Sequence, residues 1–399
     1  MEERLNKAHL ECDDWAAELL AELGSQGLMR DLRLIPQTAP SGVSQSRSSV
    51  NFTSNDYLNL ARDPRLIIAV KEVLETRGLG AASSRLVSGN MLEHESLEQK
   101  LVQVTGFPAA LSYSAGYMAN LGLITTIIGP RDTILADRLI HASLVDAIRL
   151  SGATFRRFAH NDMGRLEDLL IKIRHRESDG GKRVLIVTES VFSMDGDLAP
   201  LQELSDLAES HGALLIVDEA HAFGVFGFGR VASLGLQDNV YACTGTLSKS
   251  CGSYGGFVLG SKNLRSLLIN KSRTFIYNTA LPPLLARAAE VALDVIKAEP
   301  ERSEAALSGA RHLQKELMER GIETPQAQSQ ILPLILGGSE LALAVSEMLS
   351  GKGVYVGAFR PPTVERGKSR LRFSVTASHT QEVISRAAQE VALAYAACS

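Results

Sequence analysis

The chain has 399 residues, of which 45% are hydrophobic and 22% are charged. This length suits one large α/β domain with a smaller companion, or two to three domains of about 150 residues each, and it excludes a small scaffold held together by disulfides. Lys and Arg together number 41 against 45 Asp and Glu, which gives a net charge of −4. A balance this close to neutral disfavours binding to nucleic acid or to anionic lipid.

Four cysteines without CxxC spacing indicate reduced thiols in a cytoplasmic protein. The first residues contain no basic segment followed by an apolar one, so we expect no secretory signal. Residues 109–130 carry no charge over a length that could cross a bilayer. Because Ser112, Asn120 and other polar residues interrupt this stretch, we predict a helix buried in the protein core and no membrane span.

The predicted elements begin with a helix and a basic turn over residues 3–35, followed by a short strand over 50–53. A further helix ends at Gly78, a loop rich in glycine and serine runs to Gly89, and another helix covers about 93–105. Continuous apolar runs then predict buried strands, each followed by a helical pattern. These runs are residues 133–137, 184–188 and 213–218.

Strands that alternate with helices imply right-handed βαβ crossovers and a mostly parallel central sheet covered by helices. A hairpin-like stretch over 254–260 closes this region, and long helical stretches begin at Pro282. Strands near 331–336 and 371–375 and a last helix to Cys398 complete the chain. We therefore predict an α/β fold in three parts: an N-terminal helical segment over 1–48, a large domain over 49–285 and a smaller α+β C-terminal domain over 286–399.

Polar residues directly follow the strand predicted at 213–217, at the end where parallel α/β sheets hold their active sites. Asp218 can pair there with a positive charge in a ligand, and His221 can reach a neighbouring ligand oxygen. An aspartate that only caps the next helix is an equally open alternative for this motif alone. The same DEAH letters occur in helicases, but the phosphate-binding loop GxxxxGK[ST] that a helicase needs is missing upstream.

Lys249 stands among hydroxyl residues and is followed closely by Gly252, which is unlike the setting of a surface lysine. Hydroxyl and backbone N–H groups can hold a phosphate while a lysine amine condenses with an aldehyde. Such a lysine requires an acidic partner for a pyridine nitrogen, and Asp218 is the natural candidate.

Seven motifs follow one another along the chain and carry a family resemblance. They are SNDYL at 54–58, SRLVSGN at 84–90, FSMDGD at 192–197, VDEAH at 217–221, TLSK at 246–249, FIYNTALPP at 275–283 and RPPTV at 360–364. The chain from about 27 to 378 resembles the pyridoxal-phosphate-dependent α-oxoamine synthases, which have the aspartate-aminotransferase fold (fold type I). The last two motifs, with RLR at 370–372, favour the branch that makes 8-amino-7-oxononanoate in biotin synthesis.

The resemblance implies a role for single residues around pyridoxal 5'-phosphate. Lys249 would bond to the cofactor aldehyde, Asp218 would pair with the ring nitrogen, and His221 would bond the ring hydroxyl. His141 would stack on the ring, although a histidine satisfied within the core is the alternative for that residue alone. The other implied cofactor contacts are Gly116, Tyr117, Ser193, Thr246, Ser248 and Thr279, the last supplied by the second subunit of a homodimer.

The resemblance also implies the substrate contacts. Arg360 would bind the amino-acid carboxylate, and Thr363 and Arg30 the acyl substrate, with Arg33 as the competitor of Arg30. For Asn55 we favour a site role over that of a turn residue. The family's small, hydroxyl-bearing continuation after the DEAH-like histidine is replaced here by residues 222–223 (Ala-Phe), which leaves the shape of the pocket and the acyl partner open.

The implied reaction is the decarboxylative condensation of L-alanine with pimeloyl-CoA or pimeloyl carrier protein, catalysed by a homodimer with shared active sites and no metal. Arg360 would hold the alanine carboxylate, and the freed Lys249 amine would remove the α-proton. One alternative is another α-oxoamine synthase, such as glycine C-acetyltransferase. An alternative from a different class is a non-catalytic paralogue that only binds the cofactor.

Overall fold

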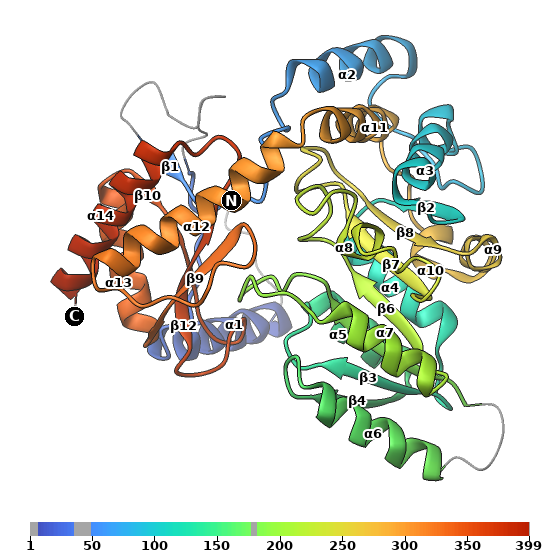
Figure 1. Cartoon of the computed structure of the whole chain (residues 1–399), viewed down its shortest axis with the longest axis horizontal. Coiled ribbons are helices and arrows are strands. Elements are labelled where there is room, and N and C mark those ends of the chain that lie inside the picture. Colours follow the sequence, from blue (N-terminus) through green and yellow to red (C-terminus); the bar gives the residue numbers. More distant parts are fainter. Residues whose placement is uncertain (1–6, 36–48, 177–181, 399) are drawn as a thin grey trace.

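The computed structural model describes residues 7–35, 49–176 and 182–398. A seven-stranded sheet with the order β2-β8-β7-β6-β5-β3-β4 forms the centre of the larger part of the molecule (Figure 1). Its strands are β2 (Ala109–Tyr113), β3 (Thr133–Asp137), β4 (Thr154–Phe158), β5 (Val184–Glu189), β6 (Leu214–Asp218), β7 (Ala242–Thr246) and β8 (Gly256–Gly260). Strand β8 runs antiparallel to both neighbours, and all other pairs are parallel. The predicted α/β fold with a mostly parallel sheet is confirmed.

Helices cover both faces of this sheet. The helices of this part are α2 (Pro64–Arg77), α3 (Leu92–Thr105), α4 (Gly116–Ile127), α5 (Ala142–Ser151), α6 (Met163–Arg176), α7 (Leu201–Ser210), α8 (Arg230–Ser233), α9 (Lys262–Lys271), α10 (Arg273–Ile276) and α11 (Pro283–Ala298). Helix α2 packs on α11, outside the layers that cover the sheet (Figure 1). Along β5, Ile186 packs into the core on the side of α6 and α7, whereas Leu185 and Val187 pack into the core on the side of α4 and α5. Burial on both faces explains why residues 184–187 of β5 are all apolar.

The prediction of one buried helix over residues 109–130 is wrong. This stretch does not form one helix: strand β2 ends at Tyr113, and helix α4 begins at Gly116. Both pieces are buried, and a strand that is apolar on both faces lacks the alternation that would distinguish it from a buried helix. Among the described residues, no helix has the length and apolar character that crossing a membrane requires.

A smaller unit follows α11. It contains α12 (Glu301–Glu319), β9 (Ile331–Gly337), α13 (Ser339–Gly351), β10 (Val354–Tyr355), β11 (Gly357–Phe359), β12 (Ser369–Ser374) and α14 (Gln381–Cys398). Strands β11, β12 and β9 form an antiparallel sheet, and β1 (Val50–Asn51) pairs with β10. Val50 and Phe52 pack in the core of this unit, so residues near the start of the chain belong to its packing. The division of the chain at 48 and 285 stays a prediction.

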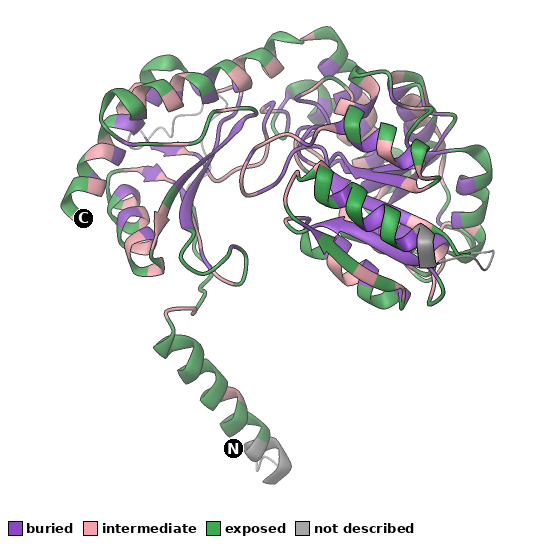
Figure 2. Cartoon of the chain, turned by 60° about the horizontal axis from the view of Figure 1, so that its bottom comes forward, coloured by how far each residue is buried: buried purple, intermediate pink, exposed green. Residues whose placement is uncertain are grey.

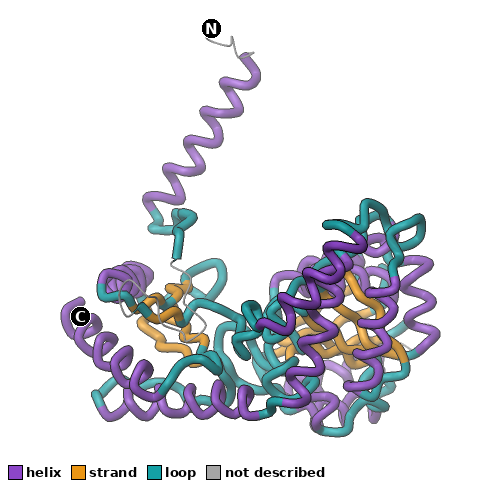
Figure 3. Tube along the Cα trace, turned by 90° about the horizontal axis from the view of Figure 1, so that it is seen from above, coloured by secondary structure: helices purple, strands orange, loops and turns teal. Residues whose placement is uncertain are grey.

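The N-terminal helix α1 (Lys7–Ser25) projects away from the rest of the molecule (Figures 2 and 3). It lies within the stretch 3–35 for which a helix and a basic turn are predicted, and residues 3–6 and 36–48 lie outside the described part of the chain. Its side chains from Cys12 onward are almost all exposed, including that of Trp15. After α1 the chain returns to the body, where the carbonyl oxygen of Met29 accepts a hydrogen bond from Arg360.

Candidate active site

Asp218 lies at the carboxyl end of β6, and its carboxylate is buried and held on both oxygens. The side-chain amide of Asn120, from α4, donates to Oδ2 at 2.8 Å, and the backbone N–H of Ala220 donates to Oδ1 at 2.9 Å. The same Asn120 amide also donates to the Ser143 hydroxyl at 2.9 Å. These bonds fix the direction in which the carboxylate faces.

Lys249 follows β7, the next strand along the sheet, and its side chain meets His221. Nζ of Lys249 lies 2.8 Å from Nε2 of His221. Burial lowers the pKa of the Lys249 amine to about 8, against the opposing effect of the carboxylates of Asp218 and Glu189. An amine that loses its proton this readily is a better nucleophile toward an aldehyde than an ordinary lysine.

His221 is held from its other side by Tyr57. The Tyr57 hydroxyl lies 2.7 Å from Nδ1 of His221, and Arg372 of β12 donates to the same hydroxyl at 3.1 Å. Burial, together with the positive charges of Lys249 and Arg372, holds the pKa of His221 well below its usual value. The ring is therefore a neutral imidazole. Asn55 lies beside this group, and its Oδ1 accepts hydrogen bonds from Tyr57 at 3.0 Å and from Arg372 at 3.2 Å.

His141 precedes α5 and caps it. Its Nδ1 lies 2.7 Å from the Ser143 hydroxyl and accepts from the Ser143 backbone N–H at 3.2 Å. Burial lowers the pKa of the His141 ring, although the Asp218 charge opposes this shift. The backbone N–H of His141 donates to the carboxylate of Glu189, and burial raises the pKa of Glu189 well above its usual value.

Our sequence analysis missed Glu189, Asn120 and Tyr57 as members of this cluster. Glu189 ends β5 in register with Asp218 at the end of β6. It therefore follows a predicted strand just as Asp218 does, and the same rule that selected Asp218 could have found it. Asn120 carries no comparable signal, because it lies inside a long uncharged stretch.

A group of backbone and hydroxyl donors surrounds the start of α4. Ala115 precedes the helix without a side-chain cap, so the first N–H groups, at Gly116 and Tyr117, lack a capping side chain. A Cβ at Gly116 would lie 3.2 Å from Cβ of Thr246, which shows how closely this turn approaches β7. The hydroxyls of Thr246 and Ser248 lie 2.7 Å apart on that side. A helix N-terminus with adjacent hydroxyls suits a phosphate group.

A cavity of about 1080 Å³ opens beside this cluster, between the carboxyl edge of the large sheet and the C-terminal unit. His141, Ser193 and Thr363 line it, so three of the predicted site residues share one cavity. Lys249, Asp218 and His221 do not line it, so the cavity adjoins the cluster on the side of His141. Ala222 and Phe223 do not line this cavity: both are buried, and the Phe223 ring packs 4.8 Å from that of Phe257.

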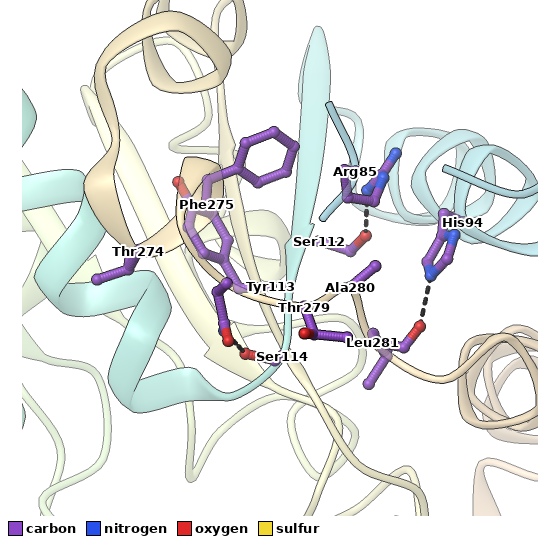
Figure 4. A pocket seen from close by; sticks show the side chains of 11 residues that line it. Arg85, His94, Ser112, Tyr113, Ser114, Thr274, Phe275, Thr279, Ala280 and Leu281 are labelled. Atoms are coloured by element: carbon purple, nitrogen blue, oxygen red, sulfur yellow. Dashed lines mark hydrogen bonds between the residues drawn. The ribbon is translucent and has the colours of Figure 1, made fainter. Parts of the chain in front are cut away.

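Thr279 lies in a different place. It lines a small separate pocket in front of β2, together with Ser114 and Arg85 (Figure 4). Asn278 donates a hydrogen bond to the Ser114 hydroxyl at the edge of the same pocket. Within one chain, Thr279 therefore belongs to this pocket and not to the lining of the large cavity.

Arg360 is buried beside the returning N-terminal segment. One of its guanidinium nitrogens donates to the Met29 carbonyl, and Nε has no hydrogen-bond partner among the described residues. Burial lowers the pKa of Arg360, and the charges of Arg30 and Arg33 lower it further. Both arginines thus lie within electrostatic range of Arg360, and the choice between them stays a prediction.

His160, in its charged form, holds the loop that carries Ser193 in place. His160 lies 3.0 Å from the carboxylate of Asp137, at the end of β3, and 2.6 Å from that of Asp197. Burial works against the charge, but these hydrogen bonds outweigh it and raise the pKa of His160 to about 10. Asp195 on the same loop forms an ion pair with Arg370 of β12 at 2.6 Å.

Comparison with known proteins gives consistent matches over nearly the whole chain. Residues 47–391 match the family described as aminotransferase class I and II. The 8-amino-7-oxononanoate synthase of Marinobacter nauticus (strain ATCC 700491 / DSM 11845 / VT8) is 42% identical over 379 residues, which cover 94% of each chain. That of Anaeromyxobacter dehalogenans (strain 2CP-1 / ATCC BAA-258) is 41% identical over 370 residues, which cover 92% of each chain.

Solved structures share the fold. A serine palmitoyltransferase from S. paucimobilis, with bound pyridoxal phosphate and myriocin, superimposes with a TM-score of 0.89 and 30% identity and covers 98% of both chains. The 8-amino-7-oxononanoate synthase of Francisella tularensis gives a TM-score of 0.74 and 29% identity and covers 87% of this chain and 97% of its own.

Proposed function

Because this chain belongs to the aminotransferase class I and II family, we propose that it condenses L-alanine with a pimeloyl thioester to give 8-amino-7-oxononanoate, carbon dioxide and free thiol. The acyl donor is pimeloyl-CoA or pimeloyl carrier protein, and the product is an intermediate of biotin synthesis. The observation that carries this proposal is the meeting of the Lys249 amine with Asp218 and His221 at the carboxyl end of the sheet, in a chain 42% identical to a relative named for this reaction.

The residues present fit pyridoxal phosphate. Lys249 offers an amine with a pKa of about 8 for the aldehyde, and Asp218 offers a fixed carboxylate for the ring nitrogen. The uncapped start of α4, with Thr246 and Ser248, fits the phosphate. To these we add Ser193 and His221 as ring contacts, and His141 as the contact for the face of the ring.

The bound cofactor supplies an electron sink for the carbanion that forms at the α-carbon of the amino acid. Arg360 binds the amino-acid carboxylate through charge-assisted hydrogen bonds. The Lys249 amine accepts the α-proton, and its pKa of about 8 lies close to the pH at which the enzyme must work. Asp218 keeps a proton on the ring nitrogen, because a nearby anion stabilises the cation.

The remaining contacts select the substrates. We assign Thr363, in the cavity wall, and Arg30 to the acyl chain, with Arg33 as the competitor of Arg30. Asn55 is assigned to the amino-acid side of the site. Its Oδ1 already accepts from Tyr57 and Arg372, so Asn55 keeps a fixed position there.

We propose that the active form is a cytoplasmic homodimer in which each chain completes the site of the other. Large apolar side chains lie exposed on the segment 79–87 and at residue 277, which include or adjoin the pocket-lining residues Arg85 and Asn278, and a second copy would cover them. They include Leu79, Leu86, Val87 and Tyr277. In this arrangement Thr279 of one chain contacts the phosphate held by the other.

Mixed dimers test the shared site. Lys249→Ala and Thr279→Ala are each expected to lower activity strongly as pure dimers. After the two variants are unfolded together and refolded, a mixed dimer contains one site with both lesions and one intact site, so activity returns. If Thr279 serves its own chain, neither site of the mixed dimer is intact and no activity returns.

Turnover with a panel of substrates tests the reaction. L-Alanine, glycine and L-serine are each offered with pimeloyl-CoA, acetyl-CoA and palmitoyl-CoA, and the released thiol is measured, with Lys249→Ala as the control without catalysis. Alanine with the pimeloyl thioester is expected to be fastest. The TM-score of 0.89 with serine palmitoyltransferase makes serine with a long-chain thioester the second candidate. Faster turnover with any other pair would overturn the proposed substrates.

A further inference from the structure

Four side chains form a hydrogen-bonded chain that links the C-terminal unit to Lys249. Arg372 donates to the Tyr57 hydroxyl at 3.1 Å, this hydroxyl lies 2.7 Å from Nδ1 of His221, and Nε2 of His221 lies 2.8 Å from Nζ of Lys249. Tyr57, His221 and Arg372 are 0%, 6% and 4% exposed. Because these groups are buried, an unmade hydrogen bond among them is costly. Each of the bonds therefore needs one donor and one acceptor, and the position of one proton determines the positions of the others.

The Tyr57 hydroxyl has one proton and two acceptors within 3.0 Å, and the Gln330 side chain is a further hydrogen-bonding neighbour. Nδ1 of His221 lies 2.7 Å away and Oδ1 of Asn55 lies 3.0 Å away. Arg372 donates to the hydroxyl oxygen, so the oxygen stays in place whichever way its proton turns. His221 also has a single ring proton, because its neutral form is favoured by burial and by the charges of Lys249, Arg372 and His141.

Two arrangements satisfy every member of this chain. When Lys249 is charged it donates to Nε2, the His221 proton is on Nδ1 and donates to Tyr57, and Tyr57 donates to Asn55. When Lys249 is neutral, the lone pair on its nitrogen accepts the His221 proton, which is then on Nε2, and Tyr57 donates to Nδ1. Between the two, Lys249 releases one proton to solvent, while His221 and Tyr57 each keep one proton.

We propose that Tyr57 is a positioning residue whose hydroxyl, held by Arg372, turns between Asn55 and His221, so that the edge of His221 facing Lys249 accepts while the amine is charged and donates once it is not. The second state at neutral pH rests on the proposed function, in which Lys249 would be bonded to the cofactor aldehyde. His221 then presents a donor to the anionic oxygen of the cofactor. Asp218, Glu189 and Arg372 are the other titratable or charged neighbours that affect where Lys249 loses its proton.

Nitrogen-15 NMR of the histidines tests this directly, because the two ring nitrogens differ strongly in shift with and without a proton. The chain contains nine histidines, and the signals of His221 are those missing from His221→Asn. In the unloaded protein, the His221 proton is expected to move from Nδ1 to Nε2 with a midpoint near pH 8, as Lys249 is titrated. Addition of pyridoxal phosphate at pH 7 is expected to cause the same move.

Two tyrosine variants form a matched pair. Tyr57→Phe removes the turning hydroxyl, so the ratio of the two His221 forms is expected to change less than about threefold over a titration in which the wild type changes more than about tenfold. Tyr113→Phe removes another buried hydroxyl, which bonds Ser272 at 3.1 Å, and is expected to behave like the wild type. If Tyr57→Phe does not fold, the wild-type titration decides alone.

A wild-type His221 that keeps one proton position through the titration, or equal responses from the two variants, would overturn the proposal. Failure of the proposed function is distinguishable from this result. A protein that binds no pyridoxal phosphate loses the cofactor arm of the experiment, whereas the titration of the unloaded protein still tests the turning hydroxyl.

Discussion

Replacing Asp218 by Asn separates two contributions that the carboxylate makes. The carboxylate accepts from the Asn120 amide on one oxygen and from the Ala220 N–H on the other, at 2.8 and 2.9 Å. An asparagine side chain has one oxygen and one NH2 group. In Asp218→Asn, one of the two donors therefore faces another donor in a buried site.

The substitution is expected to lower both the stability and the turnover of the protein, and the two effects are measured separately. A buried donor left without an acceptor costs about 1 to 3 kcal/mol, so we expect the free energy of unfolding to fall by about 2 kcal/mol. Loss of the charge removes the partner of the ring nitrogen, and we expect turnover to fall on the order of a hundredfold or more. Urea unfolding measures the first loss, and thiol release at saturating substrate measures the second.

A double variant distinguishes the two effects. Asn120→Asp combined with Asp218→Asn exchanges the amide and the carboxylate, so their mutual hydrogen bond is retained while the charge moves onto α4. We expect this protein to regain most of the lost stability, to within about 1 kcal/mol of the wild type, and to stay as inactive as the single variant. Near-normal turnover in Asp218→Asn would refute the role of its charge. Equal stability of the single and double variants would refute the hydrogen-bond argument.

Three further variants test the site and its support. Lys249→Ala is expected to bind pyridoxal phosphate without becoming labelled by it after borohydride treatment, which mass spectrometry detects; labelling as in the wild type would exclude Lys249 as the attachment point. His160→Gln is expected to lose about 2 kcal/mol of stability below pH 6.5 and nothing relative to the wild type above pH 10, because a raised pKa contributes stability that is lost as the pH rises through it. Urea unfolding of both proteins from about pH 6 to about pH 10 measures this difference in stability. A difference that stays constant with pH would contradict the raised pKa of His160. Gly245→Ala would place a Cβ 2.3 Å from the Phe257 ring, so we expect a loss of about 1 to 3 kcal/mol in thermal unfolding, whereas Gly129→Ala, which meets open space, should lie within about 0.5 kcal/mol of the wild type.

Strands β3, β5 and β6 could be predicted from the sequence, because each is a short apolar run buried on both faces. The apolar run at 133–137 became β3 without a change of bounds, and 213–218 became β6 with one residue less. The polar residue at the end of a buried apolar run marks the carboxyl end of the strand, where active sites of parallel sheets lie. Asp218 could therefore be predicted together with its strand. The helix end at Gly78 was also confirmed, since this glycine caps α2 with a φ of 77°.

Strand β2 and the hydrogen bonds of Tyr57 could not be predicted, because they depend on contacts between distant parts of the chain. Strand β2 resembled a helix because its partner β8 lies more than 140 residues further along, and local periodicity carries no information on that pairing. Tyr57 lies 164 residues from His221 and 315 from Arg372. Their shared hydrogen bonds exist only after the C-terminal unit has packed against the sheet, so spacing in the sequence could not predict them.

The large sheet and the smaller unit carry different groups of the proposed site, and this separation bears on the choice of the acyl substrate. Lys249, Asp218 and His221 follow strands of the large sheet, whereas Thr363 and Arg360 lie in the connection between β11 and β12 of the smaller unit. Ion pairing of Asp195 with Arg370, and the bond from the Ser329 hydroxyl to the Gly196 carbonyl at 2.7 Å, fix the smaller unit against the cavity. Under the proposed assignment of Thr363 to the acyl chain, we expect substitutions in the connection to change which acyl chain fits while the bonds around Lys249 stay as they are. The turning hydroxyl of Tyr57 is the exception, because Arg372 lies on the same strand as Arg370 and reaches directly into the chemical site.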